Sequence, residues 1–269
     1  MSLIDTHCHL KSFLENNTLQ DVLLRARNAG VEKMITVGTS PEDWHCYQKL
    51  ASSYNYIFFT VGLHPCYVDY DWRKHVASIS EYWNDTIKPV SLGEIGLDYF
   101  RLPKDKAKKN EIIKNQHECF FAQLEIAKIL DCPIVIHSRN AFDDCIRLID
   151  LSGVDWQKVV FHCFSEGVDK LIQLKERGGR ASFTGNITYD KNSHLCESVK
   201  VQGVDILMLE TDSPYLSPEP NRKRMNEPSK IYDIFEFLVY LLDCESDELQ
   251  NSIFRNSKEF YKLDISRRY

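Results

Sequence analysis

Eight short apolar, β-branched segments recur along the chain, and longer stretches with helical periodicity lie between them. Strands that alternate with helices form a parallel sheet, and eight such units in 269 residues predict an α/β fold, a (β/α)8 TIM barrel, as a single domain over residues 1–269. A doubly wound open sheet is the alternative, but it normally carries a glycine-rich turn after its first strand, and THCHLKSF is not one. The eight predicted strand segments are residues 3–8, 33–39, 56–63, 89–97, 132–138, 158–165, 179–187 and 205–212.

The helical stretches have the apolar stripe of an outer ring. Residues 19–30 end at Gly30, which we expect to be a C-cap, and residues 115–131 place their apolar side chains on one face. The last two amphipathic stretches, 231–244 and 248–263, would complete the ring.

Composition and charge limit the class of protein. No run of about 18 apolar residues and no signal peptide is found, so we expect a cytoplasmic monomer without membrane contact. Nine cysteines without a CxxC pair indicate free thiols in a reducing compartment. The net charge of −6 argues against a protein that coats nucleic acid electrostatically, so an anionic substrate must be held locally.

Metal-competent side chains stand at the C-terminal ends of most predicted strands, which is where barrel enzymes place their working residues. A lone histidine at such a position is more often a hydrogen-bonded structural residue. Seven imidazole and carboxylate side chains in equivalent positions indicate more than structural roles. Burying them together costs desolvation energy that a bound cation would offset. The seven are His7, His9, His64, Glu94, His137, His162 and Asp212.

Side-chain alternation along a strand separates the cysteine of the first segment from its neighbouring histidines. His7 and His9 point to one side, and Cys8 points to the other, where it packs as a small buried residue. The same alternation places the Glu210 and Asp212 side chains on one face of their strand.

The number of donors favours two metals. Four histidines and two carboxylates, leaving His64 aside, exceed what one catalytic metal uses when it keeps a position open for water. A carboxylate can bridge two ions, which can then hold a hydroxide and clamp the attacked and leaving oxygens of a phosphoester. Imidazole-rich ligation suits Zn, Mn, Fe or Co, and Mg at one position is also compatible.

Six separated motifs follow one another along the chain: IDTHCH at 4–9, GLHP at 62–65, GEIGLDY at 93–99, IHSRNA at 136–141, HCFS at 162–165 and ETDSPYLSP at 210–218. Together these motifs resemble the TatD family of metal-dependent deoxyribonucleases in the amidohydrolase superfamily. The resemblance runs from residue 4 to about residue 228 and implies a barrel of the metal-dependent hydrolase type that cleaves DNA phosphodiesters, typically as a 3' to 5' exonuclease.

The family pattern assigns a role to each donor. His7, His9 and Asp212 would bind one divalent ion, His137 and His162 the other, and Glu94 would bridge them, with His64 beside the substrate phosphate. Two departures fall in loops. Glu166 stands where glycine often follows HCFS, and the late loop has Lys223 for glycine and Met225 for arginine, which changes the expected substrate contacts.

Two loops on the metal side are basic. Residues 99–114 carry six basic and two acidic side chains, and residues 216–230 carry four basic and two acidic ones. Both follow predicted strands with ligands, so their positive potential would guide a nucleic-acid backbone. Arg101 and Arg139 are the best candidates for substrate contacts, and Tyr99 for stacking on a base. His45, His75, His117 and His194 receive no role.

The expected mechanism is attack on the terminal DNA phosphodiester by a hydroxide held between two Mg, Mn or Zn ions. The superfamily resemblance makes Asp212 the proton acceptor as well as a ligand, and Glu210 would orient a ligand. RNA is a further possible substrate. The same site would also serve a hydrolase of carboxylic esters such as a D-aminoacyl-tRNA. An inactive scaffold is the third hypothesis, disfavoured because every ligand is present.

Overall fold

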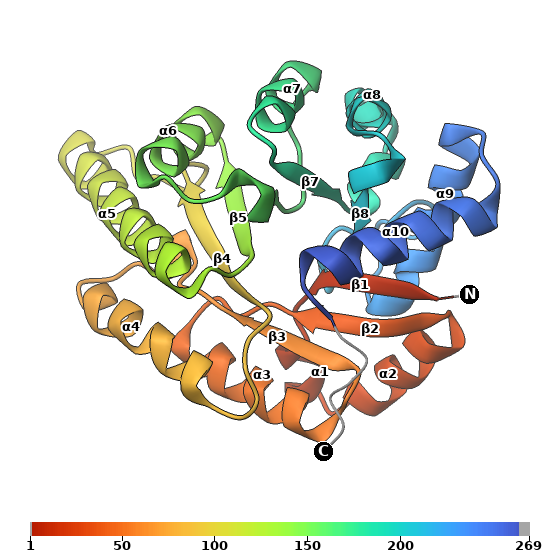
Figure 1. Cartoon of the computed structure of the whole chain (residues 1–269), viewed down its shortest axis with the longest axis horizontal. Coiled ribbons are helices and arrows are strands. Elements are labelled where there is room, and N and C mark those ends of the chain that lie inside the picture. The colour runs from red at the N-terminus through yellow and green to blue at the C-terminus, as the bar shows by residue number, and fades with distance from the viewer. Residues whose placement is uncertain (1, 264–269) are drawn as a thin grey trace.

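The computed structural model describes residues 2–263, so residue 1 and residues 264–269 of the expected single domain lie outside the described residues. Its centre is one sheet of eight strands in chain order, each parallel to the next, with helices around it (Figure 1). The chain after the last strand returns to the first, where a parallel bridge joins Ser213 to Cys8. The predicted (β/α)8 barrel is therefore confirmed.

The strands and helices alternate with few exceptions. The strands are Leu3–Cys8 (β1), Val31–Thr36 (β2), Ile57–Val61 (β3), Ser91–Asp98 (β4), Ile134–Arg139 (β5), Val159–Phe161 (β6), Arg180–Phe183 (β7) and Met208–Leu209 (β8). The helices are Lys11–Glu15 (α1), Leu19–Asn28 (α2), Pro41–Ser53 (α3), Trp72–Ser78 (α4), Lys106–Leu130 (α5), Phe142–Ser152 (α6), Val168–Glu176 (α7), Ser193–Gln202 (α8), Ile231–Leu242 (α9) and Ser246–Phe260 (α10).

Every predicted strand segment overlaps an observed strand, but most strands stop earlier than the sequence pattern suggests. The clearest cases are β6 and β8, which are three and two residues long. The backbone leaves the extended conformation after them, with positive φ at Cys163 (46°) and Asp212 (52°). Cys163 follows the predicted ligand His162, and Asp212 is itself a predicted ligand. The apolar sequence pattern therefore continues past the end of each strand into a segment whose backbone conformation serves the site.

Local sequence signals account for several helix ends. Asp105 caps α5 by accepting a hydrogen bond from the Lys108 amide at 2.8 Å. Helix α2 ends at Asn28, and Gly30 has the left-handed φ of 85° that follows such an end. No helix within residues 2–263 is long and apolar enough to span a membrane.

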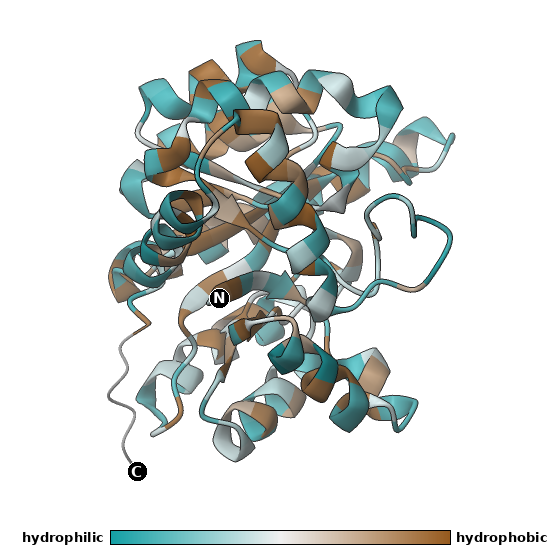
Figure 2. Cartoon of the chain, turned by 90° about the vertical axis from the view of Figure 1, so that its right-hand side faces the viewer, coloured by the Kyte–Doolittle hydropathy of each residue, from teal (hydrophilic) through white to brown (hydrophobic). Residues whose placement is uncertain are grey.

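Most strand residues are buried, between an inner and an outer layer of apolar side chains. The ribbon coloured by hydropathy shows apolar stretches along the strands in the centre of the molecule (Figure 2). The end of α10 closes the inner layer, because Phe260 and Tyr261 pack there with Ile4 and Met208. The guanidinium of Arg180, the first residue of β7, lies 4.8 Å from the centre of the Phe260 ring. This apolar plug therefore fills the N-terminal end of the barrel and leaves the C-terminal end for the polar residues.

Helix α5 fixes two strand ends with buried glutamines. Gln123 accepts a hydrogen bond from the amide of Leu63 at 2.7 Å and donates one to its carbonyl at 3.1 Å. Gln116, two turns earlier, pairs in the same way with Asp98, at 3.0 and 3.2 Å. These pairs satisfy backbone groups where β3 and β4 end, and they hold the residues that enter the site.

Candidate metal centre

The donor residues predicted from the sequence meet at the C-terminal ends of the strands. Three overlapping groups have ligand atoms within 4.8 Å of one another. The groups are His7, Glu94 and His162; His7, His9 and Asp212; and His64, Glu94 and His137. All seven predicted side chains therefore lie in one cluster, with His7 and Glu94 each belonging to two groups.

A register shift in β1 turns His7 toward this cluster. Ile4 packs in the barrel interior, and regular alternation would turn His7, three residues later, to the opposite face. The pairing of β1 with β2 shifts between Asp5 and Cys8, so His7 also points inward and its Nε2 lies 3.5 Å from Glu94. Cys8 packs in the outer core with its Sγ 3.4 Å from the Ile35 carbonyl, the direction expected from the sequence.

Glu94 lies between two sets of imidazoles. Its Oε1 is 2.7 Å from His137 Nδ1 and 2.8 Å from His162 Nε2. Its Oε2 is 3.5 Å from His7 Nε2. One buried carboxylate thus presents one oxygen to each set, which is the arrangement that a bridging ligand requires.

On the side of Glu94 that its Oε2 faces, the imidazoles of His7 and His9 converge on Asp212. His7 Nε2 and His9 Nε2 are 3.3 Å apart, and Asp212 Oδ1 is 3.8 and 3.3 Å from them. His9 Nδ1 lies 3.2 Å from the Val37 carbonyl, which can only accept, so Nδ1 carries the proton. The Nε2 lone pair of His9 therefore points at the Asp212 carboxylate.

On the side of Glu94 that its Oε1 faces, Asp98 orients His137. Asp98 Oδ2 is 3.1 Å from His137 Nε2, so the carboxylate holds a proton on that nitrogen and leaves the Nδ1 lone pair toward Glu94. Glu210 faces His162 more loosely: its Oε1 is 3.4 Å from His162 Nδ1, a buried nitrogen that makes no hydrogen bond to the described residues. Glu210 is itself fixed by the Cys163 amide at 2.6 Å and the Ser182 hydroxyl at 2.5 Å.

His64 has the same tautomer as His137 but turns its other nitrogen toward Glu94. The Cys66 amide donates to its Nδ1 at 3.0 Å, so a neutral His64 carries its proton on Nε2, which lies 3.4 Å from Glu94 Oε1. Burial and the neighbouring His137 both lower the pKa of His64, which favours the neutral form. His64 therefore presents a hydrogen-bond donor to the site, whereas its neighbour His137 presents a lone pair.

The charges of the site call for bound cations. Burial raises the pKa of Glu94, but His162 and His64 outweigh burial and lower it well below its usual value, so Glu94 is ionised. Burial lowers the pKa of His162, but Glu94 and Glu210 outweigh burial and raise it well above its usual value. The buried carboxylates are thus stable only with positive charge beside them. Protons on the imidazoles would provide that charge, and a bound metal cation would provide it with the imidazoles neutral.

The residues fit two divalent metals. Nitrogen lone pairs and carboxylate oxygens face one another across 2.7 to 3.3 Å at His137, His162 and His9. Ligands bound at about 2.1 Å to a common cation are separated by roughly such distances. Imidazole with carboxylate suits Zn, Mn or Fe, and the site is compatible with Mg at one position.

A family model described as TatD related DNase matches residues 4–262. The chain belongs to the TatD family. It is 31% identical to an uncharacterized metal-dependent hydrolase of Buchnera aphidicola over 98% of this chain and 100% of that protein. It is 29% identical to YcfH, an uncharacterized metal-dependent hydrolase of Escherichia coli, over 99% and 98% of the two chains. The crystal structure of the E. coli TatD homologue YjjV matches with a TM-score of 0.88 at 26% identity, covering 97% of this chain and 98% of that one. The protein is therefore a metal-dependent hydrolase.

Besides His64, three substrate-contact residues were predicted for this TatD protein, and they lie in different surroundings. Arg101 is exposed, and the Arg139 guanidinium lies 3.8 Å from the centre of the exposed Phe100 ring. The Tyr99 hydroxyl donates to Asp144 at 2.8 Å and lies 2.5 Å from His117 Nε2. Tyr99 is thus held toward the helix layer, and Phe100 is the exposed ring of this loop.

Asp98 is the polar residue of the site that the sequence reading missed. The predicted strand stopped at residue 97, whereas β4 continues through Asp98. The available signal was its spacing, because a residue four positions after Glu94 on one strand shares its face. Burial raises the pKa of Asp98, but the hydrogen bonds from His137 and the Phe100 amide and the charges of His137 and His64 together lower it to about 2.

Replacing Asp98 with alanine is expected to weaken divalent-metal binding about 10- to 100-fold, because His137 loses the carboxylate that holds its Nε2 proton. Competition with a chromophoric chelator measures this affinity. The matched control is Asp105→Ala, which removes the exposed cap of α5 and should leave the affinity unchanged. Wild-type affinity in Asp98→Ala would show that Asp98 does not support this ligand.

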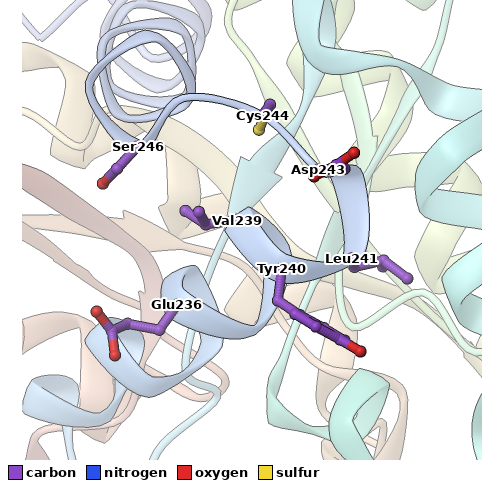
Figure 3. Close-up of a pocket in the computed structure, with 7 residues that line it drawn as sticks. All are labelled: Glu236, Val239, Tyr240, Leu241, Asp243, Cys244 and Ser246. Carbon is purple, nitrogen blue, oxygen red and sulfur yellow. The ribbon is translucent and has the colours of Figure 1, made fainter.

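A surface pocket at the junction of α9 and α10 is separate from this centre. Figure 3 shows its lining around the turn between the two helices. The lining residues are Glu236, Val239, Tyr240, Leu241, Asp243, Cys244 and Ser246, and none belongs to the three donor groups. The donor cluster at the C-terminal end of the barrel is therefore the candidate active site.

Proposed function

We propose that the protein is a two-metal deoxyribonuclease that removes nucleotides from the 3' end of DNA. The observation that carries the proposal is the position of Glu94, whose two oxygens face separate sets of imidazoles. Divalent cations held there would lower the pKa of an attacking water and neutralise charge on the phosphoryl oxygens. The description of the family as TatD related DNase supports a DNA substrate.

The loops around the mouth favour a phosphate substrate. The N-terminal part of α5 and the loop before it carry exposed Lys104, Lys106, Lys108 and Lys109. The loop after β8 carries exposed Arg222, Lys223 and Arg224. These cations follow two different ligand-bearing strands of an acidic protein, so they concentrate positive potential where a nucleic-acid backbone would enter.

The residues of the centre divide the chemical work. Burial raises the pKa of Asp212, but His9 and His7 outweigh burial and lower it, so the carboxylate is ionised and can accept the proton of the attacking water. The Nε2–H of neutral His64 can donate to a non-bridging phosphoryl oxygen. Asp98 orients His137 through its hydrogen bond, and Glu210 places a negative charge 3.4 Å from His162 Nδ1.

The test is incubation of purified protein with Mg, Mn or Zn and a single-stranded DNA labelled at its 5' end, with a D-aminoacyl-tRNA and a matched RNA in parallel reactions. Successive loss of single nucleotides from the 3' end is the expected result, seen as a ladder on a sequencing gel. Deacylation of the tRNA without DNA cleavage would favour a carboxylic-ester hydrolase and contradict the nuclease. Cleavage of RNA alone would contradict the preference for DNA.

A further inference from the structure

Two exposed tyrosines stand beside the metal centre. Tyr67 is 56% exposed and Tyr215 is 61% exposed. The Tyr67 ring centre lies 6.1 Å from that of His64, and the Tyr215 ring centre lies 6.0 Å from that of His9. Each ring thus contacts a histidine of the centre with one edge or face and leaves most of its surface in water.

The backbone holds both rings close to the donors. The Tyr67 amide donates to the His64 carbonyl at 2.8 Å, and the Tyr215 amide donates to the Asp212 carbonyl at 2.9 Å. The Tyr215 carbonyl also accepts from the buried Asn226 side chain at 2.6 Å. Both tyrosines are therefore on short, hydrogen-bonded turns that start at site residues, so their positions are tied to the centre.

The two rings stand beside different donor groups of one cluster. Tyr67 lies against His64, which groups with Glu94 and His137, and Tyr215 lies against His9, which groups with His7 and Asp212. Large exposed rings at such a place have little packing value for the folded chain and offer flat apolar faces to a ligand.

We propose that Tyr67 and Tyr215 stack on the nucleobases on either side of the scissile phosphate. The inference rests on the proposed nuclease function, because it places the phosphate between His64 and His9. Every base has a flat face, so stacking holds a strand end without reading its sequence. The two contacts would orient the phosphodiester over Glu94 and exclude ends that lack a base.

The kinetic test uses 5'-labelled single-stranded DNA in which one nucleotide is replaced by an abasic tetrahydrofuran residue at the terminal, penultimate or tenth position from the 3' end. Loss of one stacked base is expected to lower kcat/KM about 5- to 150-fold at the first two positions and not at the tenth.

Tyr67→Leu and Tyr215→Leu should show a loss of similar size on intact ends and little further loss on abasic ends. Tyr67→Phe and Tyr215→Phe keep the ring and should restore the activity. The matched control is Tyr70→Leu, three residues after Tyr67 and 90% exposed, which should cleave like the wild type.

A second measurement does not need hydrolysis. The metal-free protein is titrated into DNA that carries 2-aminopurine at the terminal or penultimate position, and stacking on tyrosine is expected to quench its fluorescence. Quenching should be weaker in Tyr67→Leu or Tyr215→Leu and unchanged in Tyr70→Leu. Quenching without any DNA cleavage by the metal-loaded protein would contradict the proposed nuclease and support the base contact. Equal rates on intact and abasic ends, or leucine variants that cleave and quench like the wild type, would overturn the inference.

Discussion

Glu94→Ala is expected to lower the rate of the proposed DNA hydrolysis by about 10³-fold or more and to reduce the bound metal below two ions per chain. Among residues 2–263, Glu94 is the one side chain whose two oxygens reach both sets of imidazoles, at 2.7 Å from His137 and 3.5 Å from His7. Its loss leaves the two metal positions without a shared anion. Elemental analysis after gel filtration counts the metal, and a gel assay with labelled DNA gives the rate.

Two further variants make this result specific. Glu94→Gln keeps the size of the side chain but removes the charge, so it should retain the fold and still lose metal. Glu111→Ala, an exposed glutamate on α5, is the matched control and should bind metal and cleave DNA like the wild type. Unchanged activity with both metals retained in Glu94→Ala would contradict the bridging role.

Gly96→Ala is expected to destabilise the protein by at least about 3 kcal/mol and to disturb the metal centre at the same time. Gly96 has φ of 141°, and a Cβ added there would lie 2.0 Å from the His137 carbonyl oxygen. Alanine must therefore strain its backbone and push β5 away from β4. Urea unfolding monitored by circular dichroism measures the stability, and chelator competition measures the metal affinity.

Gly167→Ala is the control for this substitution. Gly167 precedes α7 with an ordinary φ of −81°, and an added Cβ would meet nothing within 4 Å. Its urea midpoint should match that of the wild type. A Gly96→Ala protein with wild-type stability and metal affinity would mean that β4 and β5 can separate at no cost, contrary to the close contact in the structure.

The sequence predicts the barrel and the donor cluster well because both follow from simple periodicities. Alternating strands and helices predict the parallel sheet, and the donors fall near strand ends such as His137 in β5. The shared position of strand ends in a barrel then brings residues as distant as His7 and Asp212 within 3.8 Å.

The finer geometry depends on backbone irregularities that periodicity does not predict. The register shift that turns His7 inward is one of two in the pairing of β1 with β2. The positive φ of Asp212 follows an apolar run that resembles a continuing strand. Tyr99 illustrates the same limit for side chains, because its hydroxyl binds Asp144, 45 residues later in the chain. Such a partner is visible only once α6 has been placed beside α5.

The apolar plug at the base of the barrel has a consequence for synthesis of the protein. Ile4 leaves the ribosome about 250 residues before Phe260, Tyr261 and Leu263, which pack with it in the inner layer. A nascent chain that has completed β8 therefore still exposes the inner apolar layer to water. We expect the barrel to become stable only when α10 has emerged, so chains interrupted before residue 260 should be targets for chaperones and proteases rather than partly active enzymes.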